Sequence, residues 1–187
     1  ARNVSCYGGS LMSRNELDSF IIREARPEDA ADLLEYLRQI GSETHNLTFG
    51  PEGIPFSVEE ERRFLESMQS SQRSKYFLAL DGADIVGNAN IQSYARERMQ
   101  HRANIALSVK MSHWGQGIGS ALMRQMIGFA RSLEVELITL EVLSENKRAI
   151  ALYKKFGFEQ FGVLDRFYKL EGKYYAADYM KLDLNQQ

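Results

Sequence analysis

The sequence predicts an α/β protein, α+β-like in the order of its elements, with a mixed and mostly antiparallel twisted sheet of about seven strands flanked by about four helices. Three observations lead to this prediction. Segments in the middle of the chain alternate apolar and polar residues as strands do, flanking segments repeat apolar residues at helical spacing, and a glycine-rich loop joins a strand to a helix. The length of 187 residues fits one domain, residues 19–187, after a flexible extension, residues 1–18.

Hydrophobic periodicity places the individual elements along the chain. The expected strands span residues 19–25, 75–80, 85–94, 103–111, 135–142, 158–164 and 174–182. The expected helices span residues 27–40, 58–68, the run from the glycine loop to 131, and 146–156. We expect Gly41 to stop the first helix, and Ser57 with Glu60 forms a capping-box pattern at the start of the second. Residues 81–84 give a tight-turn signal, so the three middle strands should form an antiparallel meander.

Composition and charge argue against several classes of protein. The net charge of −2 gives no bulk attraction to nucleic acid or to an acidic membrane, so we expect neither as a partner. No apolar run approaches the roughly 20 residues that span a bilayer. Cys6 is the only cysteine, which indicates a reducing compartment, and we therefore expect a cytoplasmic protein.

The most informative segment is the glycine-rich loop before the third helix. The residues that we expect to bind a cofactor here are Gly115, Gln116, Gly117, Ile118, Gly119 and Ser120. A pyrophosphate needs several N–H donors from one side without Cβ atoms in the way, and a helix N-terminus supplies such donors with a favourable dipole. The alternative interpretation is a flexible turn that binds nothing. A dinucleotide-binding loop is excluded because Ser120 stands where G-x-G-x-x-G needs its third glycine. A Walker A loop is excluded because the segment has no Gly-Lys-Ser/Thr ending.

A second informative pattern lies downstream, where Asn146 precedes a helix that contains Tyr153. The two residues are seven positions apart, almost two helical turns, so both side chains emerge on one face and can contact two parts of one ligand. The alternative interpretation makes Tyr153 a core aromatic, because Ala149, Leu152 and Phe156 give this helix a buried face.

Together the two patterns resemble motifs A and B of the GNAT superfamily of N-acetyltransferases. The segment from Trp114 to Gly119 is similar to Q/R-x-x-G-x-G/A, with Trp114 in place of the common Gln or Arg. The residues that match A-x-x-L-Y-x-x-x-G-F in place are Ala149, Leu152, Tyr153, Gly157 and Phe158. The resemblance covers about residues 21–182, nearly the whole chain.

The resemblance implies acetyl-CoA as cosubstrate, with Asn146 on the pantetheine arm and Tyr153 as the general acid that protonates the leaving thiolate. The pantetheine amides would pair with main-chain groups of Leu107, Ser108 and Val109, and an N–H on this strand would stabilise the developing oxyanion. A primary amine of unidentified structure, on a small molecule, a protein N-terminus or a lysine, would attack directly without an acyl-enzyme. Homodimers are common in the family, so the resemblance allows a homodimer. The alternative function is a non-catalytic CoA-binding or sensing domain, which would not need Tyr153.

The acceptor side is less determined. Many family members carry a glutamate on the strand before the glycine loop, but residues 103–111 contain no carboxylate here. We take Glu43 as the candidate general base, with His101 and Glu141 as alternatives; a plain surface role is the competing interpretation for each. The loop 42–55 should cover the acceptor, where Glu43 and Glu52 would suit a cationic amine.

Two further interpretations concern charged side chains. The candidates to hold the CoA 3′-phosphate are Lys147, Arg148, Lys154 and Lys155, although a solvated helix face explains them equally well. The histidines show no metal-ligand spacing, so we predict no metal site.

Overall fold

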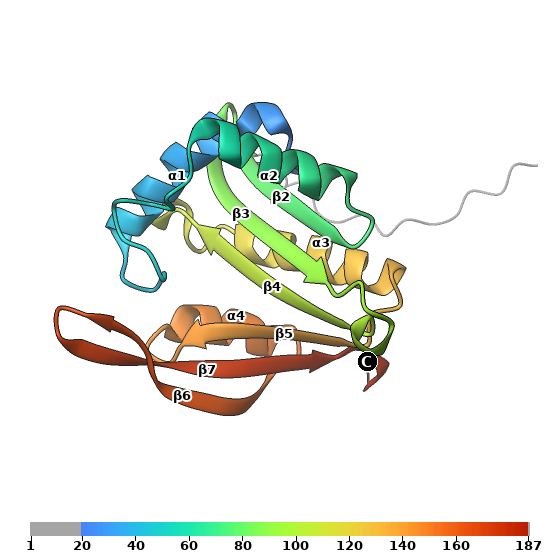
Figure 1. The fold of residues 1–187 in the computed structure, drawn as a ribbon. Coiled ribbons are helices and arrows are strands. Elements are labelled where there is room, and N and C mark those ends of the chain that lie inside the picture. Colours follow the sequence, from blue (N-terminus) through green and yellow to red (C-terminus); the bar gives the residue numbers. More distant parts are fainter. Residues whose placement is uncertain (1–19, 187) are drawn as a thin grey trace, which may run out of the picture.

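One seven-stranded sheet forms the centre of the molecule. The computed structural model describes residues 20–186, and its strands lie in the order β1-β2-β3-β4-β5-β7-β6 (Figure 1). Only β4 and β5 are parallel neighbours. The strands are β1 (Ile21–Glu24), β2 (Ser74–Asp81), β3 (Asp84–Ser93), β4 (Arg102–Val109), β5 (Leu137–Leu143), β6 (Glu159–Leu170) and β7 (Lys173–Asp183). The predicted mixed, mostly antiparallel sheet and the meander β2–β3–β4 are confirmed.

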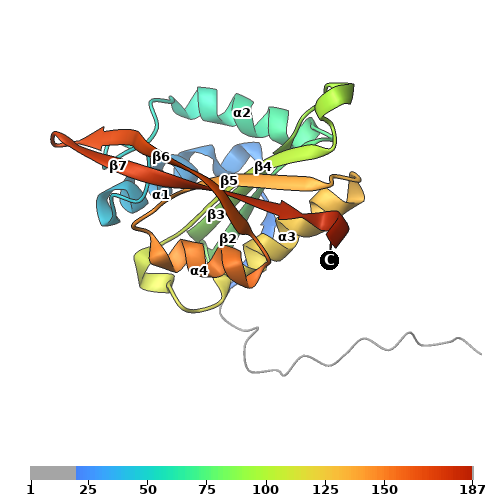
Figure 2. The same cartoon turned by 90° about the horizontal axis from the view of Figure 1, so that it is seen from below.

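Helices cover both faces of this sheet. They are α1 (Ala30–Glu43), α2 (Val58–Ser70), α3 (Ile118–Ser132) and α4 (Lys147–Lys155). The first pair, α1 and α2, lies on one face, and α3 and α4 lie on the other (Figure 2). A short 3₁₀ turn, Pro27–Asp29, leads into α1, in line with a proline at a helix start. The predicted helices are therefore present.

Each face of the sheet has its own hydrophobic core, because successive side chains of a strand point to opposite faces. On the face covered by α1 and α2, Leu78 packs with Leu33 and Leu65, and all three are fully buried. On the other face, Ile105 packs in the cluster that contains Leu122 of α3. A single strand such as β4 thus presents its neighbouring residues to two separate environments.

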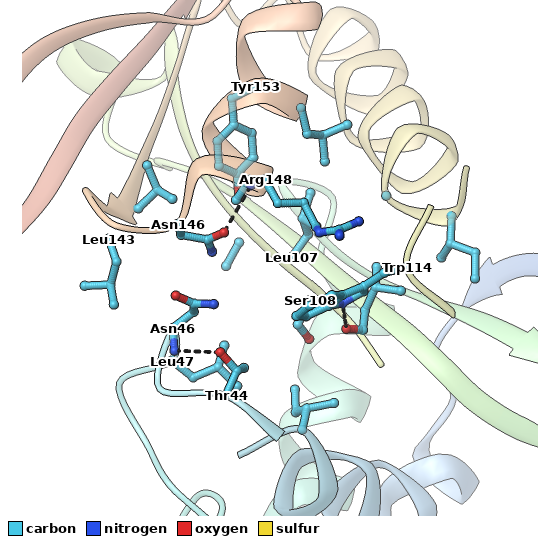
Figure 3. A pocket seen from close by; sticks show the side chains of 18 of the residues that line it. Thr44, Asn46, Leu47, Leu107, Ser108, Trp114, Leu143, Asn146, Arg148 and Tyr153 are labelled. Atoms are coloured by element: carbon cyan, nitrogen blue, oxygen red, sulfur yellow. Dashed lines mark hydrogen bonds between the residues drawn. The ribbon is translucent and has the colours of Figure 1, made fainter. Parts of the chain in front are cut away.

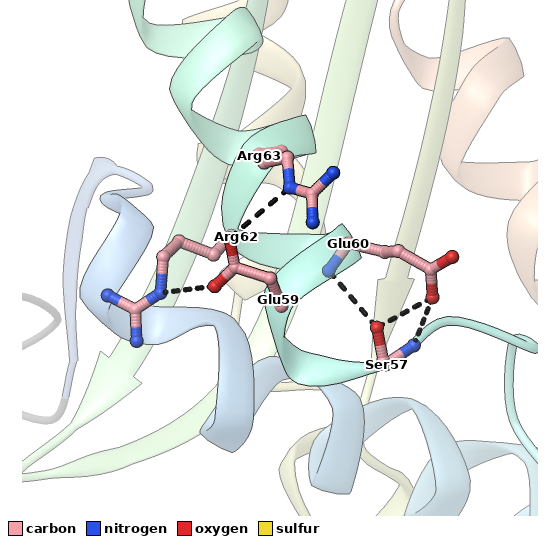
Figure 4. A network of polar contacts seen from close by, with 5 residues as sticks. All are labelled: Ser57, Glu59, Glu60, Arg62 and Arg63. Carbon is pink, nitrogen blue, oxygen red and sulfur yellow. Dashed lines mark hydrogen bonds and ion pairs between the residues drawn. The ribbon is translucent and has the colours of Figure 1, made fainter.

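The start of α2 confirms the capping box (Figure 4). The Ser57 hydroxyl accepts a hydrogen bond from the Glu60 backbone N–H (3.3 Å), and the Glu60 carboxylate accepts one from the Ser57 N–H (2.7 Å). Glu59 forms ion pairs with Arg62 and Arg63 on the exposed side of the helix. These contacts satisfy free N–H groups of the first turn and fix where the helix begins.

The prediction that Gly41 stops the first helix is wrong, since α1 continues to Glu43. Gly41 is instead a point of close packing. A Cβ at this position would lie 2.0 Å from the carbonyl oxygen of Gly50, so only glycine allows the following loop to fold back on the helix. Gly41 is therefore needed for a tertiary contact. Its local sequence does not distinguish this role from that of a helix stop.

The last hairpin differs from the prediction in length. β6 runs to Leu170, beyond the expected end at residue 164, and a tight turn with Glu171 and Gly172 at positive φ joins it to β7. The hairpin reaches back to the loop after α1, where the Tyr168 hydroxyl donates to the main-chain oxygen of His45. The third meander strand is shorter than expected, because residues after Val109 turn into a 3₁₀ segment.

Some expectations concern residues that lie outside this description. The extension of residues 1–18, with Cys6, and the first residue of the first predicted strand precede residue 20. Within residues 20–186, none of the helices combines the length and the apolar character that crossing a bilayer would require.

A buried carboxylate lies under α2. The Glu61 side chain is 1% exposed, and its Oε2 atom has no hydrogen-bond partner in the described part of the chain. Burial raises the pKa of Glu61 from 4.5 to about 7, because the charged form loses its hydration. The other titratable group beside it is Tyr76, whose pKa is also raised by burial.

The raised pKa of Glu61 predicts a pH-dependent cost to stability. The folded state keeps the Glu61 proton up to about pH 7, whereas the unfolded chain loses it near pH 4.5. The free energy of unfolding therefore falls as pH rises through this window and stays low above it. We expect Glu61→Gln to be more stable than the wild type at pH 8, on the order of 2 kcal/mol, with a gain that shrinks toward pH 4. Urea denaturation at both pH values measures this difference.

The matched control is Glu59→Gln, which removes an exposed charge from the same helix and should change stability by less than about 0.5 kcal/mol. A Glu61→Gln protein less stable than the wild type at pH 8 would contradict the prediction, since it would require a partner that stabilises the charge.

Candidate active site

The strands β4 and β5 pair over a short stretch and then separate. Their parallel register runs from Arg102 opposite Leu137 to Asn104 opposite Thr139, and beyond this point the strands diverge (Figure 1). Each keeps its outer neighbour, β3 for β4 and β7 for β5. Inner main-chain groups of β4 beyond Asn104 therefore face an opening instead of another strand.

A cavity of about 650 Å³ occupies this opening. Its walls come from β4, β5, the glycine loop, the first turn of α3, α4 and the loop after α1. The predicted cofactor-binding residues that line it are Leu107, Ser108, Val109, Gly115, Gly117, Ile118, Gly119, Ser120, Asn146 and Tyr153. Gln116 is the exception, since its side-chain amide donates to the Ser112 carbonyl (3.3 Å). Two motifs some thirty residues apart thus meet at one cavity.

The backbone of β4 faces the opening only at alternate residues. The Lys110 N–H donates to the Val86 carbonyl on β3 (2.9 Å), and extended residues alternate the side to which their N–H and C=O groups point. By this alternation, Leu107 and Val109 direct their main-chain groups into the opening, and Ser108 directs its own toward β3. Ser108 was predicted to pair through its main chain, and the register does not support this, since its side chain bonds instead to Tyr36 and Asn88.

The glycine loop presents free N–H groups without side-chain obstruction. Gly115 and Gly117 have φ values of 83° and 86°, a region that strongly favours glycine, and a Cβ at either would meet open space. Gly117 precedes Ile118 as the N-cap of α3, so the first N–H groups of this helix lack helical partners and carry the positive end of its dipole. Gly119 has another reason: a Cβ there would lie 3.0 Å from Leu152 of α4.

Trp114, the departure from the family pattern, fixes the edge of the cavity. Its indole N–H donates to the carbonyl of Val109 (2.8 Å). Val109 is one of the two residues whose main chain faces the opening. The Arg148 guanidinium lies 4.7 Å from the centre of the Trp114 ring, in the geometry of a cation–π contact. The side chain thereby joins the end of β4 to α4 across the cavity mouth.

Asn146 and Tyr153 both face the cavity from α4 (Figure 3). Asn146 is the N-cap of this helix, and its Oδ1 accepts a hydrogen bond from the Ala149 N–H (3.1 Å). The amide nitrogen of Asn146 has no hydrogen-bond partner among residues 20–186, so it can donate to a ligand. The helix cap uses the oxygen of this amide group and leaves its nitrogen available.

Tyr153 belongs to the core and also lines the cavity. Its ring is 6% exposed and packs against Phe158, with ring centres 5.8 Å apart, so it belongs to the core. Its hydroxyl lines the cavity and makes no hydrogen bond to the described residues. Burial raises the pKa of Tyr153 from its ordinary value of 10 to about 12. The phenol is therefore a proton donor at neutral pH.

Glu43 lines the cavity from the last turn of α1. Its Oε2 accepts a hydrogen bond from the Met111 N–H (2.7 Å), and its Oε1 accepts one from the Gln39 amide (3.1 Å). Glu43 thus ties the end of α1 to the segment that follows β4. Both oxygens retain a second lone pair for a ligand.

The structure separates the remaining candidates. Glu141, Arg148 and Lys155 line the cavity, whereas His101 and Glu52 do not. Lys147 donates to the Ser144 carbonyl instead of facing the cavity (2.5 Å). Within the part of the chain that the structure describes, no three His, Cys, Asp or Glu side chains gather as a metal site would require.

Some cavity residues were missed by sequence reasoning. The loop after α1 contributes Thr44, Asn46, Leu47, Thr48 and Phe49, and the last hairpin contributes Phe167. The expectation that this loop lies over the opening agrees with its position, although its individual side chains gave no signal. A second missed set is the buried polar chain that links Ser108 to Tyr36 and Asn88.

Comparison with known proteins gives the same assignment. The sequence model of the Acetyltransferase (GNAT) family matches residues 34–158. The L-amino acid N-acetyltransferase AaaT of Escherichia coli (strain K12) is 36% identical over 107 residues, which are 57% of this chain and 66% of that protein. The chain thus spans just under two thirds of the length of this curated relative.

Solved structures extend the similarity to most of the chain. A GNAT-family acetyltransferase from Streptococcus pneumoniae superposes with a TM-score of 0.83 and 30% identity, over 88% of this chain and 98% of that one. A Salmonella typhimurium protein, solved with its cofactor acetyl-CoA, shares the fold with a TM-score of 0.77 and 18% identity, over 91% and 96% of the two chains. The matched region contains α3, α4 and the cavity between β4 and β5, and the chain belongs to the GNAT family of acetyltransferases.

Proposed function

We propose that this protein transfers an acetyl group from acetyl-CoA to a primary amine, carried by a small molecule, a protein N-terminus or a lysine. The observation that carries the proposal is the meeting of three donor groups at one cavity: the free N-terminus of α3, the unpaired backbone of β4 and the Tyr153 hydroxyl. The amine attacks directly, without an acyl-enzyme. The relative named as an L-amino acid N-acetyltransferase is consistent with an amine acceptor.

The donor side of the cavity fits acetyl-CoA group by group. The N–H groups from Gly117 to Ser120 suit the pyrophosphate, because they converge without side chains and carry the helix dipole. The main-chain groups of Leu107 and Val109 can pair with pantetheine amides as an added strand would. The Asn146 amide nitrogen is a further donor to the same arm. Arg148 and Lys155 are the basic side chains placed to attract the 3′-phosphate.

The chain's own groups supply the proton transfers. The amine nitrogen would form a bond to the acetyl carbon of the thioester, the C–S bond would break, and CoA would leave as a thiolate, whose ordinary pKa is about 8.5. Tyr153, with a pKa of about 12, is the proposed general acid: its O–H would donate to the sulfur and pass its proton to the thiolate as the C–S bond breaks, and the phenol would then take a proton from solvent. A main-chain N–H of Leu107 or Val109 is the donor for the developing oxyanion. Glu43 is the proposed base that accepts the amine proton.

Two expectations from the sequence stay proposals beside this one: a cytoplasmic location and a homodimer. The competing function, a CoA-binding or sensing domain without turnover, would use the glycine loop and Asn146 in the same way. A free donor at Tyr153 has no purpose in such a domain, and this favours the enzyme.

The proposal predicts thiol release from acetyl-CoA when an acceptor amine is present. The acceptors to be tested are polyamines, aminoglycosides, amino acids, and peptides with free N-termini or lysines. Tyr153→Phe should lower kcat by about 100-fold while the Kd for CoA changes less than about twofold, since the phenol contacts the sulfur only as charge develops. Free-thiol assays and calorimetry measure the two quantities.

The matched control for that substitution is Tyr94→Phe, on an exposed tyrosine remote from the cavity. Stabilisation by CoA without thiol release on any amine would support the sensing domain. An unchanged kcat in Tyr153→Phe would remove Tyr153 from the chemistry.

Glu43→Gln should lower kcat by about 100-fold if Glu43 is the base. The glutamine keeps an oxygen that can accept the Met111 N–H bond, so the substitution removes the proton acceptor and spares the structural contact. Glu141→Gln is the control, because Glu141 is the other carboxylate that lines the cavity. Steady-state kinetics at neutral pH decide between them, and a loss confined to Glu141→Gln would reassign the base.

Trp114→Phe should weaken CoA binding by about fivefold, because one hydrogen bond that orders the Val109 carbonyl is lost. Trp114→Ala also removes the ring under Arg148 and should weaken binding by a further threefold or so. Calorimetric titration with CoA measures both. If Trp114→Phe binds CoA like the wild type and only Trp114→Ala is impaired, the indole hydrogen bond has no role in binding.

A further inference from the structure

A second cavity of about 250 Å³ lies between the sheet and the helices α1 and α2. Its apolar lining comes from Leu37, Leu47, Phe49, Ile54, Phe56 and Phe64, and its polar lining from Glu61, Tyr76, Asn88, Asn90 and Ser108. It shares Leu47, Phe49, Ala106, Leu107 and Ser108 with the larger cavity. The two spaces therefore adjoin along β4, at the strand where the thioester is proposed to lie.

Two polar groups in this second cavity are incompletely hydrogen-bonded among the described residues. Glu61 is 1% exposed, and no residue between 20 and 186 donates a hydrogen bond to its Oε2. Tyr76 accepts a hydrogen bond from the Asn88 amide, so its own O–H needs a different acceptor, and the structure supplies none from the described residues. A buried carboxylate oxygen without a donor costs free energy, so a ligand that supplies the donor would be favoured here.

A chain of hydrogen bonds fixes the direction of these groups. Tyr36 and Ser108 are joined by a 2.9 Å bond, and Ser108 donates to the Asn88 oxygen, so Tyr36 is the donor to Ser108. The Asn88 amide nitrogen then donates to Tyr76. These hydrogen bonds fix the polar side chains before any ligand binds. The last of them, Tyr76, lines the same cavity as Glu61, whose Oε2 has no donor among the described residues.

The polar wall is unexpected for this face of the sheet. Asn88 lies opposite Ser108 and Asn90 opposite Ala106 in the β3–β4 register, and alternation puts these side chains on the face covered by α1 and α2. Elsewhere this face carries the core residues Leu78, Leu80 and Ile85. Asn88 and Asn90 thus place polar side chains where the sheet borders the second cavity, as expected for a binding surface.

We propose that the second cavity binds a cationic arm of the acceptor, so that the substrate is an amine with a second, positively charged nitrogen at the end of an alkyl chain. This inference rests on the proposed acetyl transfer. The apolar walls suit methylene groups, and Glu61 pairs with the terminal ammonium. The cavity is smaller than the roughly 300 Å³ at which sites for whole ligands begin, which fits an arm.

The reacting nitrogen and the arm occupy different spaces. Glu61 does not line the larger cavity, and Tyr153 and Glu43 do not line the smaller one. A cation held at Glu61 is therefore a separate group from the amine that attacks the thioester. The distance from the reacting centre to Glu61 would select the length of the chain.

The test compares linear diamines with amino alcohols of the same chain length, which replace the terminal ammonium by a hydroxyl. Binding to the CoA-saturated protein is measured by calorimetry, and acetyl transfer by thiol release. We expect the best diamine to bind at least about tenfold more tightly than its amino alcohol in the wild type. Glu61→Gln should reduce this ratio to within about twofold, and it should raise the KM for the diamine with little change in kcat.

Glu59→Gln is the control, since it removes an exposed charge from the same helix and should keep the wild-type ratio. Circular dichroism and urea denaturation verify that Glu61→Gln is folded. Equal binding of diamine and amino alcohol, an unchanged ratio in Glu61→Gln, or no binding of any diamine would overturn the inference. A ratio that depends on Glu61 without any thiol release would support the arm site and count against acetyl transfer.

Discussion

The separation of β4 from β5 after Asn104 is the constraint on which the rest of the site depends. A continuous parallel pair would satisfy the inner backbone groups of β4 and leave no space between the two halves of the sheet. Because the strands diverge, the main chain of Leu107 and the N–H of Val109 are left without a strand partner, whereas the Val109 carbonyl accepts the Trp114 indole N–H. Unpaired backbone groups inside a protein require another partner. An extended ligand with amide groups, such as pantetheine, meets this requirement, and the β3 and β7 neighbours hold the two strands in place without it.

The alternation of β4 divides this site into two chemical halves. Leu107 and Val109 send their backbone to the opening and their side chains to the core beneath α3, beside the glycine loop. Ser108 sends its side chain to the opposite face, where it contacts Tyr36 and Asn88. A thioester placed along β4 would therefore have its cofactor on the side of α3 and α4 and be open to an acceptor from the side of α1 and α2. The two-residue alternation of β4 thus determines on which side the cofactor would lie and from which side the acceptor would approach.

The sequence predicted the parts of the fold and site that depend on local pattern. The glycine loop, Asn146 and Tyr153 are recognisable because a helix N-terminus and a helical face are encoded by residues close together in the chain. Gly41 was misjudged because its purpose is the approach of Gly50, a contact that the local pattern does not contain. The burial of Glu61 could not be predicted for a similar reason. Within Val58–Ser70 it follows Glu59 and Glu60 and resembles another solvent-exposed charge. Only the packing of α2 on the sheet distinguishes the buried glutamate from its exposed neighbours.

The burial of Glu61 also bears on how the protein balances stability against binding. A glutamine would fill the same volume without the cost of a buried charge, so the carboxylate lowers the stability of the free protein wherever it is ionised. Residues that destabilise the free state in this way concentrate at binding sites, where a ligand supplies the missing partner. A cation at Glu61 would recover the energy that burial costs, and the recovered energy would add to substrate affinity without changing the chemistry at Tyr153. With the roles proposed for the two cavities, recognition of the acceptor would be separate from transfer of the acetyl group.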